Sequence, residues 1–362
     1  MARALQLARR GLYSTDPNPR VGAVVVKGGR VVGEGWHRRA GEPHAEIHAL
    51  RQAGGEARGA TVYVTLEPCC HHGRTPPCCD ALISAGVDRV VAAMEDPNPE
   101  VEGKGLAQLR AAGIRVECGL LREQAERLNP GFTSRMRRGR PWVRCKLAMS
   151  LDGRTAMASG ESKWITSVQA REDVQRLRAR SSAVMTGIGT VLADDPALDV
   201  RLAELGGAPR QPLRVVLDRK LRIPGGARLL KGPGKVMVFT SSGEGGEDKR
   251  LAARGAELVV VPAHDSGLDL VEVLRQLAQR EVNELLLEAG ATLSGAMLRA
   301  GLIDELVIYL APHLMGDRAR GLFHLPGLES MEQRIPLKIR EIRAVGEDWR
   351  ITALPANEHI VE

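Results

Sequence analysis

The chain is poor in aromatic residues, which make up 3% of its 362 residues, with 4 Trp, 3 Tyr and 3 Phe. Proteins that hold single-stranded nucleic acid stack the bases on several aromatic side chains, so this composition argues against that class. The chain also lacks any apolar run of the roughly 18 residues that cross a bilayer. Its apolar runs have the length of Val21–Val26. We therefore expect a soluble protein with neither a nucleic-acid nor a membrane partner.

The sequence has little net charge outside its first part. There are 51 Lys and Arg against 44 Asp and Glu, a net charge of +7. Residues 1–140 contribute +6 (21 basic, 15 acidic), whereas residues 141–362 contribute +1 (30 basic, 29 acidic). A broad basic surface for a phosphate backbone is therefore not expected. Four basic residues lie in one short stretch, which we interpret as a solvated linker: Arg135, Arg137, Arg138 and Arg140.

Cysteine is also scarce, and its placement is uneven. Four of the 6 Cys fall close together, at Cys69, Cys70, Cys78 and Cys79. Adjacent cysteines are poor disulfide partners, and metal binding is the expected use of such a group in a reducing compartment. The beginning of the chain, Met1–Gly11, is typical of an amphipathic helix and lacks the apolar core of a secretion signal. We expect a cytoplasmic protein.

The length and the pattern of apolar residues predict two layered α/β domains, residues 1–140 and 141–362, divided after Gly139-Arg140. In the first domain we expect helices at 2–10, 44–53, 78–86, 103–112 and 120–129, and strands at 21–26, 31–35, 61–65, 89–94 and 114–118. In the second we expect strands at 142–150, 182–186, 213–218, 235–240, 256–261 and 283–287, and helices at 167–180, 247–254, 268–279 and 290–300. Apolar stretches after residue 304 indicate closing antiparallel strands.

One group of residues has the composition of a catalytic zinc site. His44 opens a predicted helix, and Cys69 begins a segment that runs to Cys78, where the next predicted helix starts. One imidazole and two thiolates suit zinc, and three protein ligands leave a fourth position for water. Glu46 is placed next to His44 on the same helix, where it can carry a proton without binding the metal.

This arrangement resembles the H-x-E and P-C-x-x-C pattern of zinc nucleobase deaminases, with a wider gap between the two cysteines. The wider insert can form a loop that touches substrate, and Arg74 within it is a candidate phosphate contact. The alternative is a closed structural site, which leaves His44 and Glu46 unused. It would draw on Cys69, Cys70, His71, His72, Cys78 and Cys79.

A short motif occurs twice in the first domain. Residues 16–21 and 96–101 share the pattern Asp-Pro-Asn-Pro-x-Val, and each copy lies beside the end of a predicted strand. The rigid prolines fix the backbone around Asn18 and Asn98. The two Asn side chains could converge on one pocket, or the motifs could be two independent turns.

Three stretches together narrow the resemblance to one family. They are Pro17-Asn18-Pro19-x-Val21-Gly22-Ala23-Val24, His44-Ala45-Glu46, and Thr65-Leu66-Glu67-Pro68-Cys69-Cys70-His71-x-Gly73-Arg74-Thr75-Pro76-Pro77-Cys78. They resemble the deaminase half of the bifunctional family of riboflavin biosynthesis, in which diaminohydroxyphosphoribosylaminopyrimidine deaminase is joined to 5-amino-6-(5-phosphoribosylamino)uracil reductase. The wide cysteine spacing is that family's own.

The resemblance implies a cytidine-deaminase-like three-layer α/β/α domain and a role for each matching residue. It implies that His44, Cys69 and Cys78 bind zinc and that Glu46 is the proton carrier. The implied substrate residues are Asn18 and Asn98 in the pyrimidine pocket and Arg74 at the ribose phosphate.

The second domain contains two glycine-rich helix starts. Gly187-Ile188-Gly189-Thr190 follows one predicted strand, and Gly290–Gly295 follows another. Backbone amides at a helix start can hold a phosphate, and two such places favour a nucleotide cofactor. Gly-x-Gly alone falls short of the dinucleotide fingerprint, so a plain tight turn remains the alternative.

The second half resembles the reductase half of the same family, which implies a dihydrofolate-reductase-like fold and NADPH. The matching stretches are Arg140-Pro141-Trp142-Val143, Lys146-x-Ala148-x-Ser150-Leu151-Asp152-Gly153, Ser162-x-Trp164-Ile165-Thr166, Gly187-x-Gly189-Thr190-Val191 and Asp194-Asp195-Pro196-x-Leu198. By resemblance the cofactor positions are Ala148, Trp164, Thr190, Asp194, Gly290, Ala291, Thr292, Leu293, Ser294 and Gly295. The implied substrate positions are Ser162, Arg178, Leu198, Arg201 and Glu288.

For the reductase chemistry we nominate Lys146 and Glu288 as an ionisable pair beside the hydride-transfer centre, with a structural charge pair as the alternative. The proton donor to the ring oxygen is left open between Lys146, Glu288 and water. The chain departs from the family pattern at Gln175, Ser182 and Arg219. Arg219 could pair with the 2'-phosphate of NADPH or point to solvent.

The function predicted is a two-step enzyme that first removes the pyrimidine 2-amino group as ammonia and then reduces the ribosyl group with NADPH. We also expect a homo-oligomer. One competing hypothesis is a nucleic-acid base deaminase with a binding module, which would need a basic, aromatic groove. Another is a structural zinc scaffold without chemistry, in which changing Glu46 would alter no activity.

Overall fold

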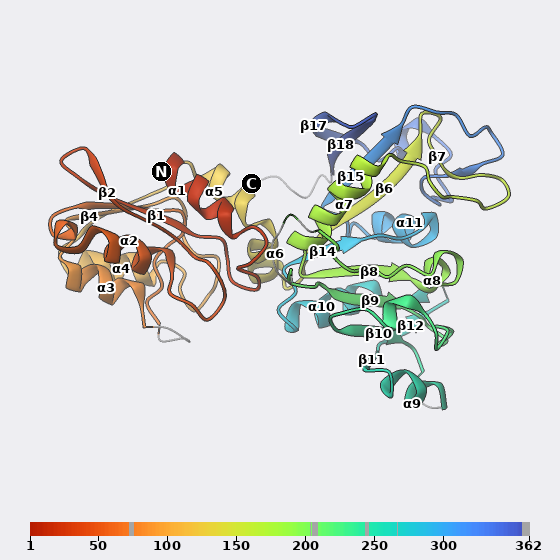
Figure 1. The fold of residues 1–362 in the computed structure, drawn as a ribbon, viewed down its shortest axis with the longest axis horizontal. Helices are drawn as coiled ribbons and strands as arrows, with labels where there is room; N and C mark the ends of the chain where they lie inside the picture. The colour runs from red at the N-terminus through yellow and green to blue at the C-terminus, as the bar shows by residue number, and fades with distance from the viewer. Residues whose placement is uncertain (72–75, 203, 205–208, 243–245, 266, 357–362) are drawn as a thin grey trace. The chain divides into compact units, whose positions relative to one another are not determined.

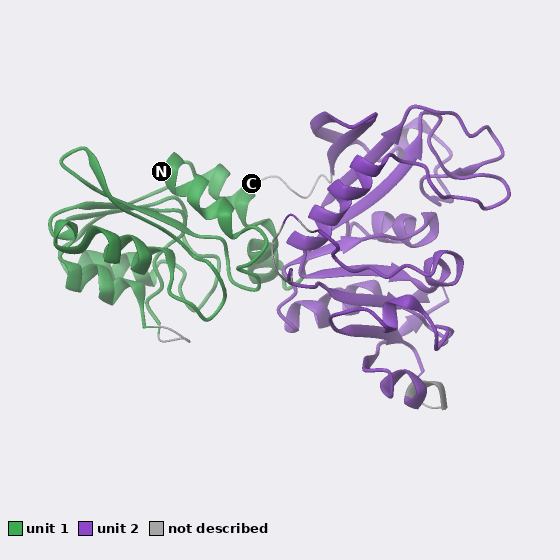
Figure 2. Ribbon diagram, in the orientation of Figure 1, with its two compact units in different colours: residues 1–140 green, residues 141–362 purple. Residues whose placement is uncertain are grey.

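The computed structural model describes residues 1–362 except 72–75, 203, 205–208, 243–245, 266 and 357–362. The chain divides into two compact units, Met1–Arg140 and Pro141–Glu362 (Figure 2). Among the described residues, no helix is both long and apolar enough to span a membrane.

The first unit is built on a five-stranded mixed sheet with the order β2-β1-β3-β4-β5 (Figure 1). The β1–β2 and β1–β3 pairs are antiparallel, and β3, β4 and β5 run parallel to one another. The strands are β1 (Gly22–Lys27), β2 (Arg30–Trp36), β3 (Thr61–Val64), β4 (Arg89–Ala92) and β5 (Arg115–Cys118). The helices are α1 (Ala2–Ala8), α2 (Ala45–Ala53), α3 (Cys78–Ala85), α4 (Lys104–Ala111), α5 (Arg122–Leu128) and α6 (Pro130–Arg138).

Helices cover both faces of this sheet, so the predicted three-layer α/β/α fold is confirmed. Alternate residues of the strands point to opposite faces. On one face the strands pack against α2, α3 and α4 through Ala49, Leu82, Leu106 and other apolar residues. On the other face a second set of apolar residues joins α1, α5 and α6, including Leu5 and Phe132.

Close approach of α2 to the sheet depends on glycine. A Cβ at Gly35 in β2 would lie 2.1 Å from the carbonyl oxygen of Ala45 and 2.6 Å from the amide nitrogen of Ala49. No side chain fits there without moving the helix, because real Cβ contacts are longer. The backbone of β2 therefore sets the position of α2.

The basic stretch near residue 138 is a helix, and its interpretation as a solvated linker is wrong. α6 begins with Pro130 at its first turn and ends at Gly139, whose φ of 63° is left-handed. Pro and Gly at these ends are standard helix boundaries. Phe132 is buried, and the arginines of the last turn lie where the helix dipole favours positive charge.

The second unit is built on a nine-stranded sheet in the described part of the chain, with the order β11-β10-β9-β8-β14-β6-β15-β18-β17. The strands from β11 to β15 are parallel, and β18 and β17 close the sheet in antiparallel fashion, as expected for the end of the chain. The strands are β6 (Trp142–Ser150), β8 (Ala183–Gly187), β9 (Leu213–Leu217), β10 (Val236–Thr240), β11 (Ala256–Val260), β14 (Glu284–Leu287), β15 (Glu305–Ala311), β17 (Leu337–Val345) and β18 (Asp348–Pro355). Two short pairs lie outside it, β7 (Arg154–Ala156) with β16 (Arg320–Gly321) and β12 (Ala263–His264) with β13 (Gly267–Leu268).

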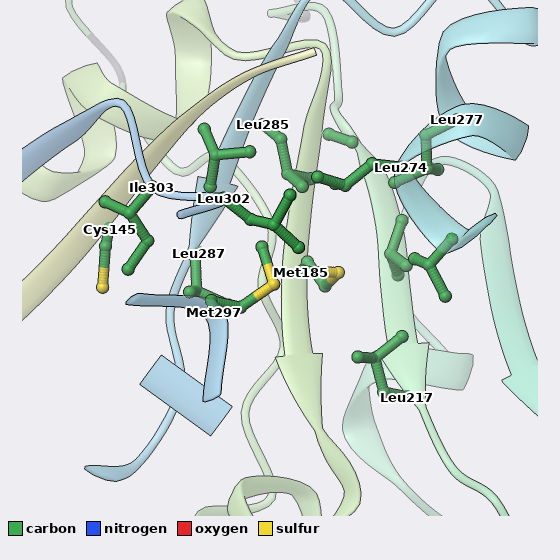
Figure 3. Packing of buried hydrophobic residues seen from close by; sticks show 14 of the residues in the cluster. Cys145, Met185, Leu217, Leu274, Leu277, Leu285, Leu287, Met297, Leu302 and Ile303 are labelled. Atoms are coloured by element: carbon green, nitrogen blue, oxygen red, sulfur yellow. The ribbon is translucent and has the colours of Figure 1, made fainter. Parts of the chain in front are cut away.

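Helices again cover both faces of the large sheet. The helices are α7 (Val168–Arg180), α8 (Ile188–Asp194), α9 (Gly246–Ala252), α10 (Leu270–Gln279) and α11 (Ala291–Arg299). The main core lies under α10 and α11, where Leu274 and Met297 meet Met185 and Leu287 of the strands (Figure 3). The opposite face packs against α7 through Val184, Leu286 and their neighbours. Successive residues of β8 and β14 thus enter different cores, as their period-2 alternation requires.

The amino ends of the central strands are tied together by buried charges. Arg144 of β6, with a side chain 2% exposed, donates to Glu284 of β14 at 2.9 Å and to Glu305 of β15 at 3.0 Å. Asp304 accepts the amide of Val143 at 2.8 Å. This network joins three neighbouring strands at their amino ends.

A second buried network fastens α7 to the end of the sheet. Asp173 of α7 accepts the hydroxyl of Tyr309 at 2.6 Å and forms salt bridges with Arg343 at 2.9 Å and Arg350 at 3.0 Å. These partners come from β15, β17 and β18. One carboxylate therefore links a helix to three strands.

Candidate functional site

The predicted metal ligands converge in the first unit. His44 caps the start of α2, Cys69 lies in the loop after β3, and Cys78 is the first residue of α3. Their ligand atoms lie within 4.8 Å of one another. His44 Nδ1 is 3.5 Å from Cys69 Sγ and 3.3 Å from Cys78 Sγ.

The electrostatics of this cluster favour a bound cation. The hydrogen bond from Cys78 lowers the pKa of the Cys69 thiol to about 4, and the same bond raises the pKa of Cys78. The hydrogen bond with Cys69 raises the pKa of His44. Cys69 also accepts the backbone amide of Cys78 at 3.3 Å. One thiolate is thus present at neutral pH, where a metal ion finds a ready negative ligand.

Glu46 lies in the first turn of α2, directly beside the cluster, and is 3% exposed. Burial raises the pKa of its carboxyl, and its Oε2 has no hydrogen-bond partner among the described residues. A buried polar atom left without a partner is costly, and such atoms are concentrated at functional sites. The free oxygen is therefore available to a substrate or a water molecule.

The donor set fits zinc. Zinc bound to sulfur at about 2.3 Å and to nitrogen at about 2.0 Å in a tetrahedron holds these donors about 3.5 Å apart, and the two measured separations are 3.5 and 3.3 Å. A neutral imidazole and two sulfurs match the preference of this ion. His44, Cys69 and Cys78 are the residues that would hold it.

His37 is part of this site and was missed by sequence reasoning. Its ring packs edge-on against that of His44 at 5.2 Å between centroids. Its Nε2 is 3.1 Å from Nδ2 of Asn18, and its Nδ1 is 3.3 Å from the carbonyl oxygen of Pro43. Burial lowers the pKa of His37. The sole signal in the sequence is its place two positions after the predicted strand 31–35.

The two copies of the repeated motif are held by different contacts. Asn18 is bound to His37 beside the metal ligands. Asn98 forms a local turn. Its side-chain Oδ1 accepts the backbone N–H of Glu100 at 3.1 Å, and its backbone N–H donates to Oδ1 of Asp96 at 2.8 Å. Arg74 lies outside the described residues.

A further buried carboxylate, Glu67, was also missed by sequence reasoning. It lies two positions before Cys69 and is 3% exposed. Its oxygens accept backbone amides of residues that are distant in the sequence, namely Asp96, Gly103, Gly105 and Leu106. Glu67 therefore connects the ligand-bearing loop after β3 with the second copy of the motif.

In the second unit, the nominated residues lie around the central strands. The pairing of Leu287 with Cys145 is the last in register between β14 and β6, so Glu288 follows beside Lys146. Glu288 forms a bidentate salt bridge with Arg178, at 2.6 and 2.9 Å, and Arg178 also donates to the carbonyl oxygen of Asp199 at 3.1 Å.

These neighbours change the acid–base properties of the pair. Burial lowers the pKa of Lys146, and the charge of Glu288 opposes that shift. Burial by itself would raise the pKa of Glu288, but the attraction of Arg178 outweighs it and the pKa is lowered. The salt bridge with Arg178 thus favours the anionic form of Glu288.

Two helix starts lie at the carboxyl ends of the central strands of this unit. α8 and α11 begin at the carboxyl ends of the neighbouring parallel strands β8 and β14. A Cβ placed on Gly189 or Gly290 would meet no described atom within 4 Å. Ligands of open α/β sheets bind at such carboxyl ends, where helix starts offer free amides. The residues present therefore fit a nucleotide cofactor.

The remaining predicted cofactor residues differ in exposure. Trp164 is 71% exposed, and the guanidinium of Arg171 lies 4.4 Å from its ring centroid. Asp194 ends α8, and Lys163 donates to its carbonyl oxygen at 3.1 Å. Gly295 instead packs away from solvent, since a Cβ there would lie 2.1 Å from the carbonyl oxygen of His324. Of the others, Thr292 is exposed and Ser294 is buried. Four are half-buried: Ala148, Thr190, Ala291 and Leu293.

The predicted substrate residues also differ in how exposed their side chains are. Arg201 keeps a side chain that is 59% exposed, at 3.3 Å from the carboxylate of Asp199. Ser162 is half-buried in the loop between β7 and α7. Leu198 is buried in the core under α7, so its side chain contributes to packing.

The three departures from the family pattern occupy different surroundings. Gln175 accepts the backbone amide of Arg201 at 2.9 Å. Ser182 accepts the amides of Asn283 and Glu284 at 2.9 and 3.1 Å, at the amino ends of the strands. Arg219 is exposed and donates to the carbonyl oxygen of His264 at 3.1 Å.

Two different family models match the chain, one within each compact unit. A model of the cytidine and deoxycytidylate deaminase zinc-binding region matches residues 1–94. A model of the RibD C-terminal domain matches residues 141–351. Zinc is therefore the metal of the first unit and NADPH the cofactor of the second.

Full-length relatives and solved structures agree with these matches. The chain is 55% identical to the riboflavin biosynthesis protein RibD of Escherichia coli (strain K12), covering 96% of each chain. It is 50% identical to that of Haemophilus influenzae, covering 98% of this chain and 96% of that one. Acinetobacter baumannii RibD, form 1, has a TM-score of 0.92 and 49% identity, with 98% of both chains covered. The chain belongs to the RibD family of riboflavin biosynthesis proteins.

Proposed function

We propose that this chain is a bifunctional enzyme of riboflavin biosynthesis, with a zinc-dependent pyrimidine deaminase in residues 1–140 and an NADPH-dependent reductase in residues 141–362. The observation that carries the proposal is the cluster of His44, Cys69 and Cys78 beside Glu46, whose buried Oε2 has no hydrogen-bond partner among the described residues. In a member of this family, that arrangement has both the ligands and the proton carrier that hydrolytic deamination requires.

The first reaction is hydrolysis of 2,5-diamino-6-(5-phosphoribosylamino)pyrimidin-4(3H)-one at its 2-amino group. Zinc, when held by His44, Cys69 and Cys78, supplies the Lewis acidity that makes water nucleophilic near neutral pH. Glu46 takes a proton from the attacking water and gives it to the leaving amino group, which departs as ammonia. Burial raises the pKa of the Glu46 carboxyl, which makes it a better proton acceptor than an exposed carboxylate.

We assign substrate positioning in the first unit to the repeated motifs. Asn18, held by His37 next to the ligand His44, is assigned to the pyrimidine edge. Asn98 is assigned to the same ring, and Arg74 to the ribose phosphate. An arginine offers bidentate hydrogen bonds to a phosphate.

The second reaction reduces the ribosyl side chain of 5-amino-6-(5-phosphoribosylamino)uracil to ribityl. NADPH, when bound, supplies the hydride that reaches C1 of the sugar. Lys146 and Glu288 lie beside the place assigned to this carbon, and Arg178 keeps Glu288 ionised. Lys146, whose pKa burial lowers, is the better placed of the two to give a proton to the ring oxygen.

We assign the cofactor to the carboxyl ends of β8 and β14. The helix starts at Gly290–Thr292 and Thr190 are assigned to its phosphates, and the exposed ring of Trp164 is assigned to contact it. Arg201 is assigned to the substrate phosphate, because Arg178 is already engaged with Glu288 and Asp199.

We further propose a cytoplasmic location and a homo-oligomer. Cys69 and Cys78 are free cysteines, and thiolate ligands persist in a reducing compartment. At the edge of the large sheet, β17 exposes Leu337, Ile339 and Ile342. Apolar edge strands tend to pair with another chain. Light scattering on the wild type and on Ile339→Lys tests the oligomer, which this substitution is expected to weaken.

Mass spectrometry of the diaminopyrimidinone ribotide after incubation with zinc-loaded protein tests both reactions. The expected result is exchange of one amino group for oxygen with or without NADPH, and addition of two hydrogens only when NADPH is present. Deamination alone would contradict the reductase assignment. An unchanged ribotide in both incubations would contradict the assignment of the substrate.

A further inference from the structure

Glu67 makes an unusual set of contacts for a side chain so close to a metal ligand. Its Oε1 accepts the amides of Gly105 at 2.9 Å and Leu106 at 3.2 Å. Its Oε2 accepts the amides of Asp96 at 3.0 Å and Gly103 at 2.9 Å. A buried carboxylate thus receives four backbone donors, all from the segment 96–106.

This segment includes Asn98 and the first turn of α4. Amides of the first helical turn have no partner within their own helix, and Glu67 supplies one for Gly105 and Leu106. Its negative charge also lies at the end of α4 where the helix dipole favours an anion. Glu67 is therefore the anchor of the start of α4.

Two further contacts hold the same segment against the loop that carries Cys69. A Cβ at Gly105 would lie 2.1 Å from the carbonyl oxygen of Pro68, so the backbones touch there. The thiol of Cys79 donates to the carbonyl oxygens of Pro68 at 3.4 Å and Gly105 at 3.5 Å. Cys69 follows Pro68 in the chain and Cys78 precedes Cys79, and both of these cysteines belong to the metal cluster.

We propose that Glu67 is a positioning residue of the deaminase site, which fixes the segment 96–106, and with it Asn98, relative to the zinc ligands. The proposal rests on the function proposed above, because it takes Asn98 to be a substrate contact. Glu67 does not touch substrate in this arrangement. It sets the distance between the metal and the part of the pocket that receives the pyrimidine.

Only a carboxylate satisfies all four donors. It offers acceptors on both oxygens, whereas the amide of glutamine replaces one oxygen by a group that can only donate. In Glu67→Gln, two of the four backbone N–H groups therefore face another donor and lose their partner. A buried donor without an acceptor is destabilising, and the segment is expected to move until water reaches it.

The test compares Glu67→Gln with Glu102→Gln in the full-length, zinc-loaded protein. Glu102 is an exposed residue of the same segment, so its substitution removes the same charge without touching the anchor. Three quantities are measured for each variant: zinc content, hydrogen exchange of the amides of Asp96, Gly103, Gly105 and Leu106, and the KM and kcat for ammonia release. Reduction of the preformed uracil ribotide is the control for folding of the second unit.

We expect Glu67→Gln to keep its zinc and its reductase activity. Its four amides should exchange at least about tenfold faster, and its KM for the pyrimidine should rise about tenfold or more, with a smaller change in kcat. Glu102→Gln should match the wild type in every measurement. Glu67→Asp keeps the charge but is one methylene shorter. Its exchange rates and its KM should lie between those of Glu67→Gln and those of the wild type.

Three outcomes would overturn the proposal. One is an unchanged exchange rate in Glu67→Gln, and another is an unchanged KM. The third is loss of zinc together with activity, since Glu67 would then act on the ligand loop itself. A failure of the proposed function looks different: the wild type would release no ammonia, while the exchange of the four amides would still report whether Glu67 holds the segment.

Discussion

Two buried carboxylates lie next to the metal ligands, and their hydrogen bonds give them opposite properties. Glu67 has an amide donor for every oxygen, whereas Glu46 has an oxygen with no partner among the described residues. A satisfied carboxylate is fixed in place, and an unsatisfied one is available for proton transfer. We therefore propose that the same residue type serves structure at Glu67 and chemistry at Glu46.

Substitution of Glu46 by Gln should abolish ammonia release while zinc stays bound. Gln fills the same volume but cannot carry a proton, so a loss of about a hundredfold or more in kcat is expected. Ammonia release and bound zinc are measured on the same preparation. Glu56→Gln is the matched control, since Glu56 is exposed and pairs with Arg30 on the surface. Retained ammonia release in Glu46→Gln would contradict the role of Glu46 as the proton carrier.

Asp96 should make the stability of the first unit depend on pH. Burial raises its pKa to about 7, so the folded state holds this proton more tightly than the unfolded state does. Its contribution to stability is fully present below about pH 4 and is lost as the pH rises through about 7. Asp96→Asn stays neutral, and it should match the wild type near pH 4 and exceed it at pH 8 by roughly 2–4 kcal/mol.

Thermal unfolding of the first unit at the two pH values measures this effect. Glu95→Gln, an exposed neighbour, serves as the control for the removal of one negative charge. An equal difference between Asp96→Asn and the wild type at pH 4 and pH 8 would show that Asp96 does not titrate in this range.

The site residues that the sequence revealed are those whose chemistry is local in the chain. His44 and Glu46 are two positions apart on one helix, and the cysteine spacing is distinctive by itself. His37 and Glu67 were missed because their partners are set by tertiary structure. Glu67 binds amides 29 to 39 positions away, and no local pattern encodes such contacts.

At the scale of elements, the position of α2 determines the geometry of the metal centre, because that helix carries both His44 and Glu46. Gly35→Ala should push α2 away from β2, since its Cβ would collide with backbone atoms of Ala45 and Ala49. We expect weaker zinc binding and a loss of stability of about 1–3 kcal/mol. Zinc content after dialysis and the unfolding midpoint measure these effects.

Gly29→Ala controls for the general effect of replacing a glycine in this hairpin. A Cβ at Gly29 meets nothing described within 4 Å, although its φ of 76° carries its own strain. If Gly35→Ala bound zinc as firmly as Gly29→Ala, α2 would not be held by the contact with β2.

Asp173 should be the main anchor of α7. Asp173→Asn weakens its bonds to Arg350 and to the partly exposed Arg343, and a cost of about 1–3 kcal/mol is expected for the loss of charge-assisted hydrogen bonds. Burial would raise the pKa of Asp173, but Tyr309 and the two arginines outweigh it, and the pKa is lowered. Its contribution is therefore fully present above about pH 4 and is lost as the pH falls below that value.

Denaturant unfolding of Asp173→Asn and wild type at pH 7 and pH 3 measures this difference. Glu172→Gln, at the exposed neighbouring position of α7, is the control. The gap between Asp173→Asn and the wild type should be large at pH 7 and narrower at pH 3. A gap that is wider at pH 3 would contradict the assigned direction of the shift.

Most elements follow from their apolar patterns, and the one clear error has a physical cause. The predicted helices and strands of the first unit match those observed within a few residues, because each has one buried face. α6 was taken for a linker because its arginines dominate its composition. Its helical state depends on burial of Phe132 against α1 and α5, which the sequence does not display.

At the scale of the whole molecule, two compact units carry two different chemistries, and the candidate metal cluster found among the described residues lies in the first. Chelation with EDTA should therefore stop ammonia release and leave NADPH-dependent reduction of the preformed uracil ribotide unchanged. Both reactions are followed on one sample, and added zinc should restore the first. Loss of reduction on chelation would contradict the division of the chain into a zinc unit and a metal-independent unit.

In the large sheet of the second unit, the contacts that stabilise the fold and the groups assigned to the cofactor lie at opposite ends of the strands. Arg144, Glu284 and Glu305 join the amino ends of β6, β14 and β15, whereas the helix starts assigned to the cofactor lie at the carboxyl ends. Breaking the buried charges would cost about 3–5 kcal/mol, but changes at the other end of the strands leave them intact. Laboratory evolution can use this division. A library that randomises the exposed positions at the helix starts after β8 and β14, and keeps Glu288 and the three charged residues, should yield mostly folded variants, among which new substrate preferences can be selected.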